Sequence, residues 1–312
     1  MLKVYEHQRR SSVLRHPMLP CLSPYHTINL TAGCPNRCVY CYAQSYDFHP
    51  GWGSVIFFSN TLELLKKELP RKRKKPRLVY FSTASEPFLP VPPILEDLYR
   101  IMEILLEQNI FLLISTKCPI PDRFIKLFQR YPGRVHIQVG LTTVDDEVRC
   151  LLEPNAASVA DRLDNLRRLV RGGVRAEARM DPLVPGLSDT LDSLLNLLEK
   201  MSEIKVKSAA ASYLFMRRGI DGPKKLTLRD WSFYKMAKRL YTHKVTDYCG
   251  HGVIWIPDTE YRREKYKLLK EIAASHGVTI NLCGCKNKDL TTECCHPRLP
   301  EPDDQNDQLS FV

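Results

Sequence analysis

Long apolar runs are the first thing this sequence lacks. No stretch of about 18 consecutive apolar residues occurs, and a membrane-crossing helix needs roughly 20. Residues 1–17, MLKVYEHQRRSSVLRHP, also contain no apolar core of the kind that defines a secretory signal. We therefore expect a cytoplasmic protein without a membrane partner, and we expect it to be a monomer.

Evenly distributed cysteines are absent as well. The eleven cysteines are an odd number, and two groups of them fall at 34–41 and 283–295. A framework of disulfides is typical of small secreted chains rather than of a chain of 312 residues. The grouping instead favours metal ligation in a reducing compartment.

Negative charge is scarce relative to positive charge. The chain has 46 Lys and Arg residues against 35 Asp and Glu residues, which gives a net charge of +11. Such a balance favours a polyanionic partner, either nucleic acid or an acidic peptide, although an inert basic surface would look the same. The most basic segment, RKRKKPR at 71–77, is either a solvated connection or a nucleic-acid contact.

Strand-like and helix-like segments alternate along most of the chain. The expected strands are 27–32, 78–82, 111–115, 135–142, 174–180 and 205–213, and the expected helices are 61–69, 94–105, 121–130, 158–170, 191–198 and 228–242. Regular alternation of this kind predicts βα units around a parallel sheet. Ser158 is the expected N-cap of its helix, because its hydroxyl can accept a free backbone N–H.

Two of the expected strands have a polar side. Apolar residues alternate with His136 and Gln138 in one strand and with Glu177 and Arg179 in the next. A parallel sheet that is buried on both faces is apolar throughout, so the polar row favours a barrel whose lumen is lined for a ligand. The sequence therefore predicts an α/β fold, a partial (β/α)6 TIM-type barrel, with its site at the carboxyl ends of the strands. We divide the chain into an extended lead-in (1–26), the barrel core (27–245) and a C-terminal cysteine-rich extension (246–312).

The strongest motif is TAGCPNRCVYCYA at 31–43. Cys34, Cys38 and Cys41 follow the pattern C-x3-C-x2-C directly after a short strand. Closed zinc sites normally use four ligands, and iron–sulfur clusters are held by cysteine thiolates. Three thiols therefore leave one metal position open to bind something else. A zinc loop or three incidental cysteines are the alternatives.

This motif resembles the signature of the radical S-adenosylmethionine (SAM) superfamily, C-x3-C-x-Φ-C, with Tyr40 in the aromatic place. The resemblance implies a 4Fe-4S cluster held by Cys34, Cys38 and Cys41, whose fourth iron chelates the amino and carboxylate groups of SAM. It also implies that one electron, delivered by a reducing partner such as flavodoxin or ferredoxin, cleaves SAM to methionine and a 5′-deoxyadenosyl radical. The fold of the superfamily is the partial barrel expected above.

Residues 27–215 carry further motifs in the order found in the spore photoproduct lyase-like branch of this superfamily. The segment STASEPFLP at 82–90 resembles the loop that binds the amino group of SAM, and Lys117 matches a lysine that reaches the SAM carboxylate. The cofactor-binding residues that the resemblance implies are Tyr40, Ser82, Thr83, Ser85, Glu86, Lys117, Thr142, Thr143 and Arg179. Arg179 could equally bind the substrate or pair with Glu177. Glu153 and Asp181 match two further turns of the branch.

One position departs from that branch. Spore photoproduct lyase has a hydrogen-donating cysteine after its second strand, whereas this chain has FSTASE there. Cys118 and Cys150 lie near other expected strand ends and are the remaining candidates for a hydrogen donor, although each could equally be a packed cysteine. Repair of a thymine dimer by the lyase chemistry is therefore not expected.

An expected helix at 261–275 and an expected strand in HGVTINL lead into the second group of cysteines, which lies in CGCKNKDLTTECC. Cys283, Cys285, Cys294 and Cys295 match the ligand count of an auxiliary 4Fe-4S cluster or of a zinc site, and binding no metal is the third alternative. Adjacent cysteines point in different directions, so Cys249 or His296 could replace one of the pair at 294–295.

These observations predict a radical SAM enzyme that cleaves SAM reductively and abstracts hydrogen from a nucleic acid or a peptide. The alternative is a zinc- or iron–sulfur-dependent protein that binds nucleic acid or senses redox state without turning SAM over. Metal analysis and an assay for 5′-deoxyadenosine separate the two hypotheses.

Overall fold

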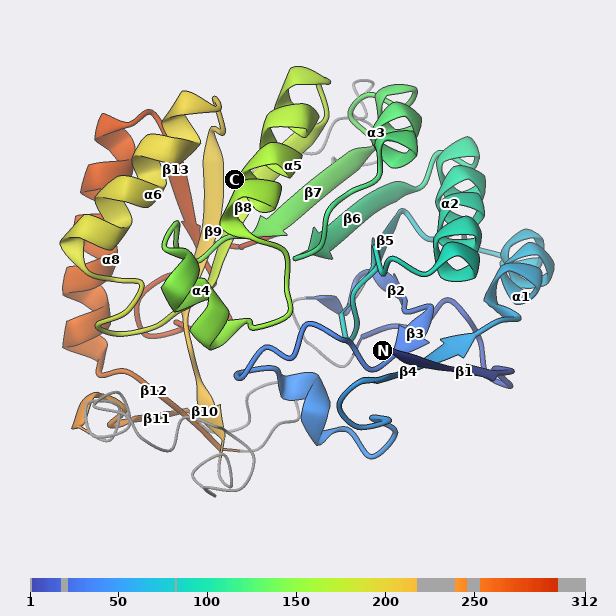
Figure 1. Cartoon of the computed structure of the whole chain (residues 1–312), viewed down its shortest axis with the longest axis horizontal. Coiled ribbons are helices and arrows are strands. Elements are labelled where there is room, and N and C mark those ends of the chain that lie inside the picture. Colours follow the sequence, from blue (N-terminus) through green and yellow to red (C-terminus); the bar gives the residue numbers. More distant parts are fainter. Residues whose placement is uncertain (1, 18–21, 82, 218–238, 246–252, 297–312) are drawn as a thin grey trace.

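A parallel sheet of seven strands forms the centre of the molecule (Figure 1). The computed structural model describes residues 2–17, 22–81, 83–217, 239–245 and 253–296. The central strands, in spatial order, are β13 (Thr279–Leu282), β9 (Ser208–Tyr213), β8 (Arg175–Leu183), β7 (Val135–Gly140), β6 (Phe111–Thr116), β5 (Leu78–Phe81) and β2 (His26–Ile28). Every neighbouring pair runs parallel, as a sheet built from βα units requires.

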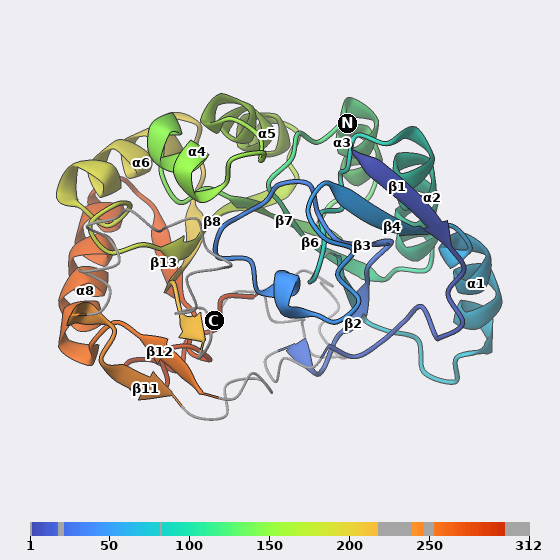
Figure 2. The ribbon, with the colours of Figure 1, turned by 60° about the horizontal axis from the view of Figure 1, so that its bottom comes forward.

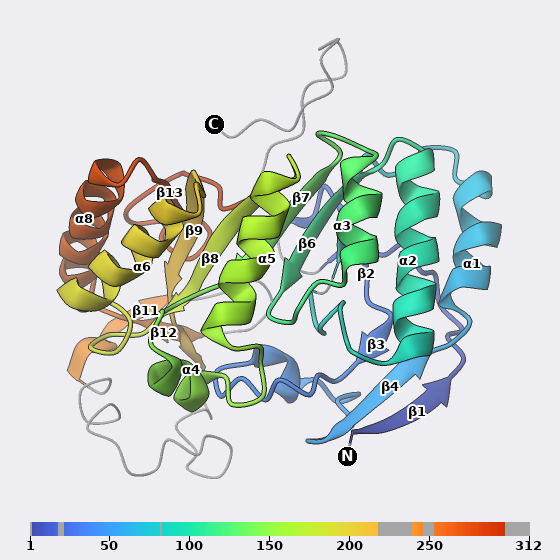
Figure 3. The ribbon, with the colours of Figure 1, turned by 45° about the horizontal axis from the view of Figure 1, so that its top comes forward.

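Helices lie between successive strands in the chain and cover one face of the sheet. They are α1 (Thr61–Glu68), α2 (Pro92–Glu107), α3 (Asp122–Gln129), α4 (Asp146–Leu152), α5 (Val159–Arg171), α6 (Leu191–Glu203) and α8 (Thr259–Ser275). Figure 3 shows most of them side by side along one face, and Figure 2 shows the sheet curving with these helices on its outer side. The predicted fold class, an α/β partial barrel, is confirmed.

The helices pack on the sheet through apolar stripes. Leu98 and Leu105 of α2 recur at helical spacing and share the main core with Leu112 of β6, all fully buried. Each such side chain contributes roughly 1.5–3 kcal/mol of transfer free energy. The N-terminus of α5 has the capping box expected at Ser158, in which the Ser158 hydroxyl accepts the backbone N–H of Asp161.

The inner face of the sheet carries the polar row that the sequence predicted. Glu177 is fully buried; it accepts Gln138 Nε2 at 2.5 Å and lies 3.2 Å from His136 Nε2. Arg179 does not pair with Glu177, which was one of the alternatives. Its guanidinium donates to Gln138 Oε1 at 2.7 Å and to Asp181 Oδ2 at 2.8 Å. The lumen is therefore a connected polar network that leads from the barrel interior to the carboxyl ends of the strands.

The sheet has one strand more than the six that were predicted. β13 pairs with β9 from Thr279↔Ser208 to Leu282↔Ala211, although its residues were assigned to the C-terminal extension. The physical reason is that α8 and β13 form one further βα unit. The helix 261–275 and the strand in HGVTINL were both expected; what the sequence did not show is that this strand pairs with β9.

Two small sheets flank the barrel. β1 (Lys3–His7) runs parallel to β4 (Ser54–Phe58), and β3 (Thr31–Ala32) pairs with β4 in the antiparallel sense. The expected strand 27–32 is therefore divided between β2 and the small sheet. The other small sheet contains β10 (Met216–Arg217), β12 (Ile254–Ile256) and β11 (His243–Val245).

Some of the sequence predictions concern residues that the structure does not describe. Ser82, Cys249 and most of the expected helix 228–242 lie outside the described residues. In the part of the chain that the structure covers, no helix has both the length and the apolar character needed to cross a membrane.

Candidate active site

A cavity of about 240 Å³ lies at the carboxyl ends of the central strands. Its wall combines the three-cysteine loop after β2 with residues at the ends of β5, β6, β7 and β8, and with the loop after β13. This is the end of the barrel at which the sequence placed the site. Because parallel strands deliver their C-terminal loops to one edge, residues far apart in the chain meet here.

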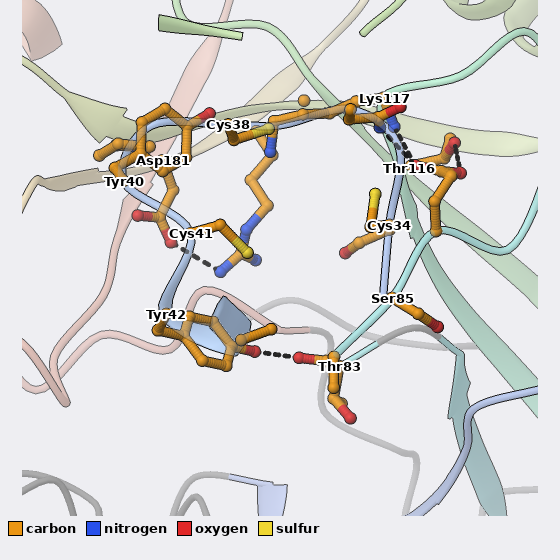
Figure 4. A pocket seen from close by; sticks show the side chains of 18 of the residues that line it. Cys34, Cys38, Tyr40, Cys41, Tyr42, Thr83, Ser85, Thr116, Lys117 and Asp181 are labelled. Carbon is orange, nitrogen blue, oxygen red and sulfur yellow. Dashed lines mark hydrogen bonds and ion pairs between the residues drawn. The ribbon is translucent and has the colours of Figure 1, made fainter. Parts of the chain in front are cut away.

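The three cysteines of the loop after β2 face this cavity. In Figure 4 the thiols of Cys34, Cys38 and Cys41 point toward one shared space. None of the three is in a disulfide, and Cys38 is buried. Among the described residues, no three Cys, His, Asp or Glu side chains stand close enough together to hold a metal ion in this structure. The donor set still fits an iron–sulfur cluster, because thiolates are the ligands such clusters use and all three share one wall.

The shape of the cysteine loop depends on Gly33. Its φ is +83°, and a Cβ at this position would lie 2.6 Å from Pro50 Cγ and 2.8 Å from the Ser54 carbonyl oxygen. Only glycine fits such a backbone at so close an approach. The turn that follows is fixed by the backbone N–H of Cys41, which donates to the Cys38 carbonyl at 3.0 Å. The chain then enters a 3-10 turn, η2 (Tyr42–Ser45).

Lys117 reaches the cavity from the end of β6. Its ammonium lies 3.8 Å from Glu153 Oε1 and 5.6 Å from the centre of the Tyr40 ring. Glu153 is fully buried, accepts the Tyr40 hydroxyl and pairs with Arg162. Burial alone would raise the pKa of Glu153, but Lys117 and Arg162 outweigh it and hold that pKa below its ordinary value. Two cations therefore face one carboxylate, which leaves positive charge beside the cavity. Gly140 makes room for the lysine, because a Cβ there would lie 2.8 Å from Lys117 Cγ.

Glu86 lies on the cavity wall, where protein groups already occupy its carboxylate. Oε1 accepts the Thr116 hydroxyl at 2.5 Å and the Phe88 N–H at 3.2 Å. Oε2 accepts the Lys117 N–H at 2.9 Å and Asn36 Nδ2 at 3.4 Å. Burial raises the pKa of Glu86 in spite of these donors. A ligand amino group would have to replace one of them, so the contact with SAM stays a prediction.

The remaining predicted cofactor contacts divide into two groups. Thr83 and Ser85 line the cavity, and the Thr83 carbonyl accepts the hydroxyl of Tyr42. Thr142 and Thr143 are buried and are not among the residues that line it. The Thr143 hydroxyl accepts a backbone N–H two residues further on, at 3.0 Å. The structure does not bring these two threonines to the cavity.

A second charged group lies on the wall formed by β8 and the loop after β13. Asp181 accepts Lys286 Nζ at 2.5 Å, Arg179 Nη2 at 2.8 Å and the Ser212 hydroxyl at 2.8 Å. Burial alone would raise the pKa of Asp181, but Lys286 and Arg179 hold it well below its ordinary value. The Lys286 ammonium also lies 5.2 Å from the centre of the Phe215 ring. Here again two cations share one carboxylate at the edge of the cavity.

The loop after β13 supplies part of the cavity wall directly. Cys283 and Cys295 both line the cavity and lie in one buried cluster. Hydrogen bonds from Cys285 and Cys295 hold the pKa of Cys283 well below its ordinary value, whereas the bond to Cys283 raises the pKa of Cys295. Cys294 is not among the lining residues. Cys283, Cys285 and Cys295 thus pack together, although these three of the four predicted ligands are not close enough in this structure to hold a metal ion.

The two cysteines considered as hydrogen donors lie elsewhere. Cys118 is buried, and its thiol donates to Asn36 Oδ1 at 3.5 Å. Cys150 is exposed on α4, where its sulfur accepts Arg149 Nη2 at 2.6 Å. Neither lines the cavity.

Sequence reasoning missed several residues that line the cavity. They include Tyr42, Tyr80 and Lys286. His296, which the sequence offered only as a possible metal ligand, also lines the cavity, and its ring contacts Tyr80 edge-on with ring centres 5.4 Å apart. Tyr80 could have been found from strand alternation, because Val79 and Phe81 belong to the main core and Tyr80 does not. Lys286 has no such signal, since its position depends on the long-range pairing of β13.

A partial barrel that gathers three loop thiols and two groups of cations around one cavity defines a cluster-dependent enzyme. A family model described as the radical SAM superfamily matches residues 28–201, more than half of the chain. The chain belongs to the radical SAM superfamily and is a radical SAM enzyme. Membership implies a 4Fe-4S cluster and SAM, and it decides for the enzyme against the zinc-dependent binding protein.

Two relatives from viruses are similar in sequence. A radical SAM Nalpha-GlyT isomerase of Pseudomonas phage M6 is 25% identical over 256 residues, which cover 80% of this chain and 51% of the phage protein. An uncharacterised protein of Acidianus two-tailed virus is 24% identical over 210 residues, 63% of this chain and 69% of the viral protein. The chain therefore spans about half the length of the phage isomerase.

Solved structures share the fold at low identity. A mutant of spore photoproduct lyase superposes with a TM-score of 0.68 at 14% identity, covering 89% of this chain and 81% of the lyase. A radical SAM methyltransferase from Sphaerobacter thermophilus gives a TM-score of 0.53 at 16% identity, covering 87% of this chain and 70% of the methyltransferase. These similarities establish the fold of the barrel and not the substrate.

Proposed function

We propose that this enzyme cleaves SAM reductively to methionine and a 5′-deoxyadenosyl radical, and that the radical abstracts a hydrogen atom from a nucleic-acid substrate. The observation that carries the proposal is the shared cavity, in which the thiols of Cys34, Cys38 and Cys41 lie on one wall with Lys117 and Arg179 nearby. When bound, the cluster and SAM would supply the radical. The residues of the chain would bind and orient SAM and substrate and exclude water.

Lys117 is the proposed partner of the SAM carboxylate. Its ammonium lies at the cavity, where Lys117 and Arg162 share the single carboxylate of Glu153. A ligand carboxylate would neutralise the remaining positive charge. Thr83, Ser85 and Glu86 surround the proposed position of the amino group. Tyr40 is fixed by its hydrogen bond to Glu153 and would present a rigid ring to the nucleoside.

Three observations favour nucleic acid over a peptide as the substrate. Aromatic rings of Tyr42, Tyr80 and Phe215 line the cavity, and bases stack on such rings. Arg179 and Lys286 together outweigh Asp181 in charge, which suits a phosphate. Spore photoproduct lyase, the similar structure, has been solved with a dinucleoside spore photoproduct. The basic segment 71–77 precedes β5, so it lies at the opposite end of the barrel and is not part of this proposal.

The proposal includes a reductant and a compartment. An electron must reach the cluster, and a flavodoxin- or ferredoxin-class protein is the proposed donor. A cluster with an open iron position needs a reducing compartment, for which we propose the cytoplasm. The auxiliary cluster on Cys283, Cys285, Cys294 and Cys295 stays a prediction, which the iron count below tests.

The test is anaerobic reconstitution with iron and sulfide, followed by metal analysis and a deoxyadenosine assay with SAM and a low-potential reductant. We expect about four irons per chain in the primary cluster and formation of 5′-deoxyadenosine. Cys38→Ala should lose both, whereas Cys150→Ala, which removes an exposed thiol outside the cavity, should keep both. Zinc without iron, or a fully loaded cluster that binds SAM and yields no deoxyadenosine, would refute the proposed function.

A further inference from the structure

Two thiols from the loop after β13 face the same cavity as the three thiols after β2. Cys283 and Cys295 are each 5% exposed, and the little surface they keep lies on the cavity wall. They form one buried cluster with Ala210 of β9. Of the described cysteines outside the three-cysteine loop, these are the two that line the cavity.

The backbone holds this pair in place from the β13 side. The N–H of Cys283 donates to the Ala211 carbonyl at 3.1 Å, which continues the pairing of β13 with β9. The N–H of Gly284 then donates to the Glu293 carbonyl at 3.0 Å and closes the loop two residues before Cys295. A Cβ at Gly284 would lie 2.6 Å from that carbonyl oxygen, so glycine is what allows the approach.

The barrel holds the pair from the lumen side. Gln138 Nε2 donates to the Cys295 carbonyl at 2.9 Å, and the same amide is bonded to Glu177. Lys286, three residues after Cys283, is anchored on Asp181 and Ser212. The two thiols are therefore set by the central sheet itself and not by a surface loop.

We propose that Cys295 is the hydrogen-atom donor of the reaction and that Cys283 is its partner in a redox-active dithiol. This inference rests on the proposed function, because it needs a carbon radical in the cavity. The segment FSTASE at the end of the second expected strand contains no cysteine, so the hydrogen donor has to come from another part of the chain. Cys295 also replaces Cys118 and Cys150, neither of which reaches the cavity.

The atoms and electrons balance as follows. A carbon radical in the cavity takes a hydrogen atom from Cys295; a C–H bond forms, the S–H bond breaks homolytically and a thiyl radical remains. The Cys283 sulfur loses its proton to water and bonds to that thiyl radical, which gives a disulfide radical anion. Its extra electron passes to the oxidised form of the ferredoxin-class partner, which leaves a Cys283–Cys295 disulfide. A thioredoxin-class dithiol returns two electrons and two protons and restores both thiols.

The test needs no knowledge of the substrate, because the deoxyadenosyl radical itself can take the hydrogen. The reconstituted, thiol-reduced enzyme is mixed with SAM and photoreduced flavodoxin in D2O, where thiol hydrogens exchange and carbon-bound hydrogens do not. We expect deoxyadenosine that carries one deuterium atom, detected by mass spectrometry. We also expect a disulfide between Cys283 and Cys295, mapped in peptides, to accumulate in proportion to labelled deoxyadenosine.

The control is the exposed thiol of Cys150, which does not line the cavity. In Cys295→Ala the labelled fraction of whatever deoxyadenosine still forms should fall about tenfold or more, a difference of about 1.4 kcal/mol in partition. In Cys150→Ala the label and the disulfide should persist. Cys295→Ser serves as a second variant if the alanine form does not fold.

Three other outcomes would each overturn a different statement: the identity of the donor, the dithiol, or the proposed function. Deoxyadenosine whose label survives Cys295→Ala overturns the assignment of the donor. An iron count of about eight that falls to about four in Cys283→Ala/Cys295→Ala shows a second cluster and overturns the dithiol. No deoxyadenosine at all from a fully loaded enzyme refutes the proposed function and not this inference alone.

Discussion

Glu153 is the residue whose loss should expose how the cavity is held together. Its carboxylate is fully buried, accepts the Tyr40 hydroxyl, pairs with Arg162 and lies 3.8 Å from the Lys117 ammonium. Glu153→Gln keeps the volume and removes the charge, so a buried guanidinium and a mostly buried ammonium lose their counter-ion. Removing one partner of a buried pair costs about 3–5 kcal/mol. Arg162 keeps two carbonyl acceptors, at 3.0 Å each, which places the expected loss near the lower end of that range.

The measurement is urea unfolding of the metal-free protein under anaerobic conditions. The slope of the unfolding free energy against urea concentration is compared between variants. The control is Glu63→Gln, because Glu63 and Lys66 form an ion pair at 3.2 Å whose side chains are 63% and 51% exposed. Such a pair contributes about 0–1 kcal/mol. A loss below about 1 kcal/mol for Glu153→Gln, at an unchanged slope, would refute the reasoning from burial.

The same variant predicts a pH dependence. The pKa of Glu153 is lower in the folded protein than its ordinary value of 4.5, so its stabilising effect is complete above pH 4.5. That effect is lost as the pH falls from 4.5 through the folded pKa, because over this interval the unfolded state binds a proton that the folded state does not. The difference in unfolding free energy between the wild type and Glu153→Gln should therefore shrink below pH 4.5. A difference that grows there would contradict the sign.

Three further variants test other parts of the molecule. Lys117→Met should raise the Kd for SAM about tenfold or more in anaerobic equilibrium dialysis, since a charge-assisted hydrogen bond is worth roughly 1.5–3 kcal/mol. The control is Lys126→Met, at an exposed position. An unchanged Kd for Lys117→Met would rule out binding of the SAM carboxylate by Lys117. Gly284→Ala should lower the unfolding free energy by about 1–3 kcal/mol, because its Cβ would meet the Glu293 carbonyl; full stability would mean that the loop closes otherwise. Burial and then His16 lower the pKa of His26 from 6.5 to about 4, so stability should fall as the pH drops between these values, and His26→Gln should remove that slope in thermal unfolding.

The elements that the sequence predicted well are those with local signals. Helices such as α5 can be predicted from an apolar stripe and from the capping box at Ser158. The polar row of β7 and β8 is visible in alternation alone, which is why the barrel lumen could be expected. β13 was expected as a strand in HGVTINL but was assigned to the extension, because nothing in its own residues tells which strand it pairs with. Its place beside β9 is decided by packing between segments that are distant in the chain.

The site divides in the same way. Cys34, Cys38 and Lys117 could be named from motif spacing, and all three line the cavity. Lys286 and Cys295 could not be placed there, because they arrive through the long-range pairing of β13. The partners of Glu86 were also invisible in the sequence, since its oxygens accept from the Thr116 hydroxyl and from backbone N–H groups that only the folded chain brings near.

The position of β13 at the end of the sheet has a consequence for assembly. The three-cysteine loop follows the first central strand, whereas the wall that carries Cys283 and Cys295 follows the last. During synthesis the early strands can fold before the late segment has left the ribosome. The cysteine loop would then be open to delivery of iron and sulfide while one side of the chamber is still missing. The time needed to synthesise the late segment would then be the interval in which iron and sulfide can reach the cysteine loop before the cavity is complete.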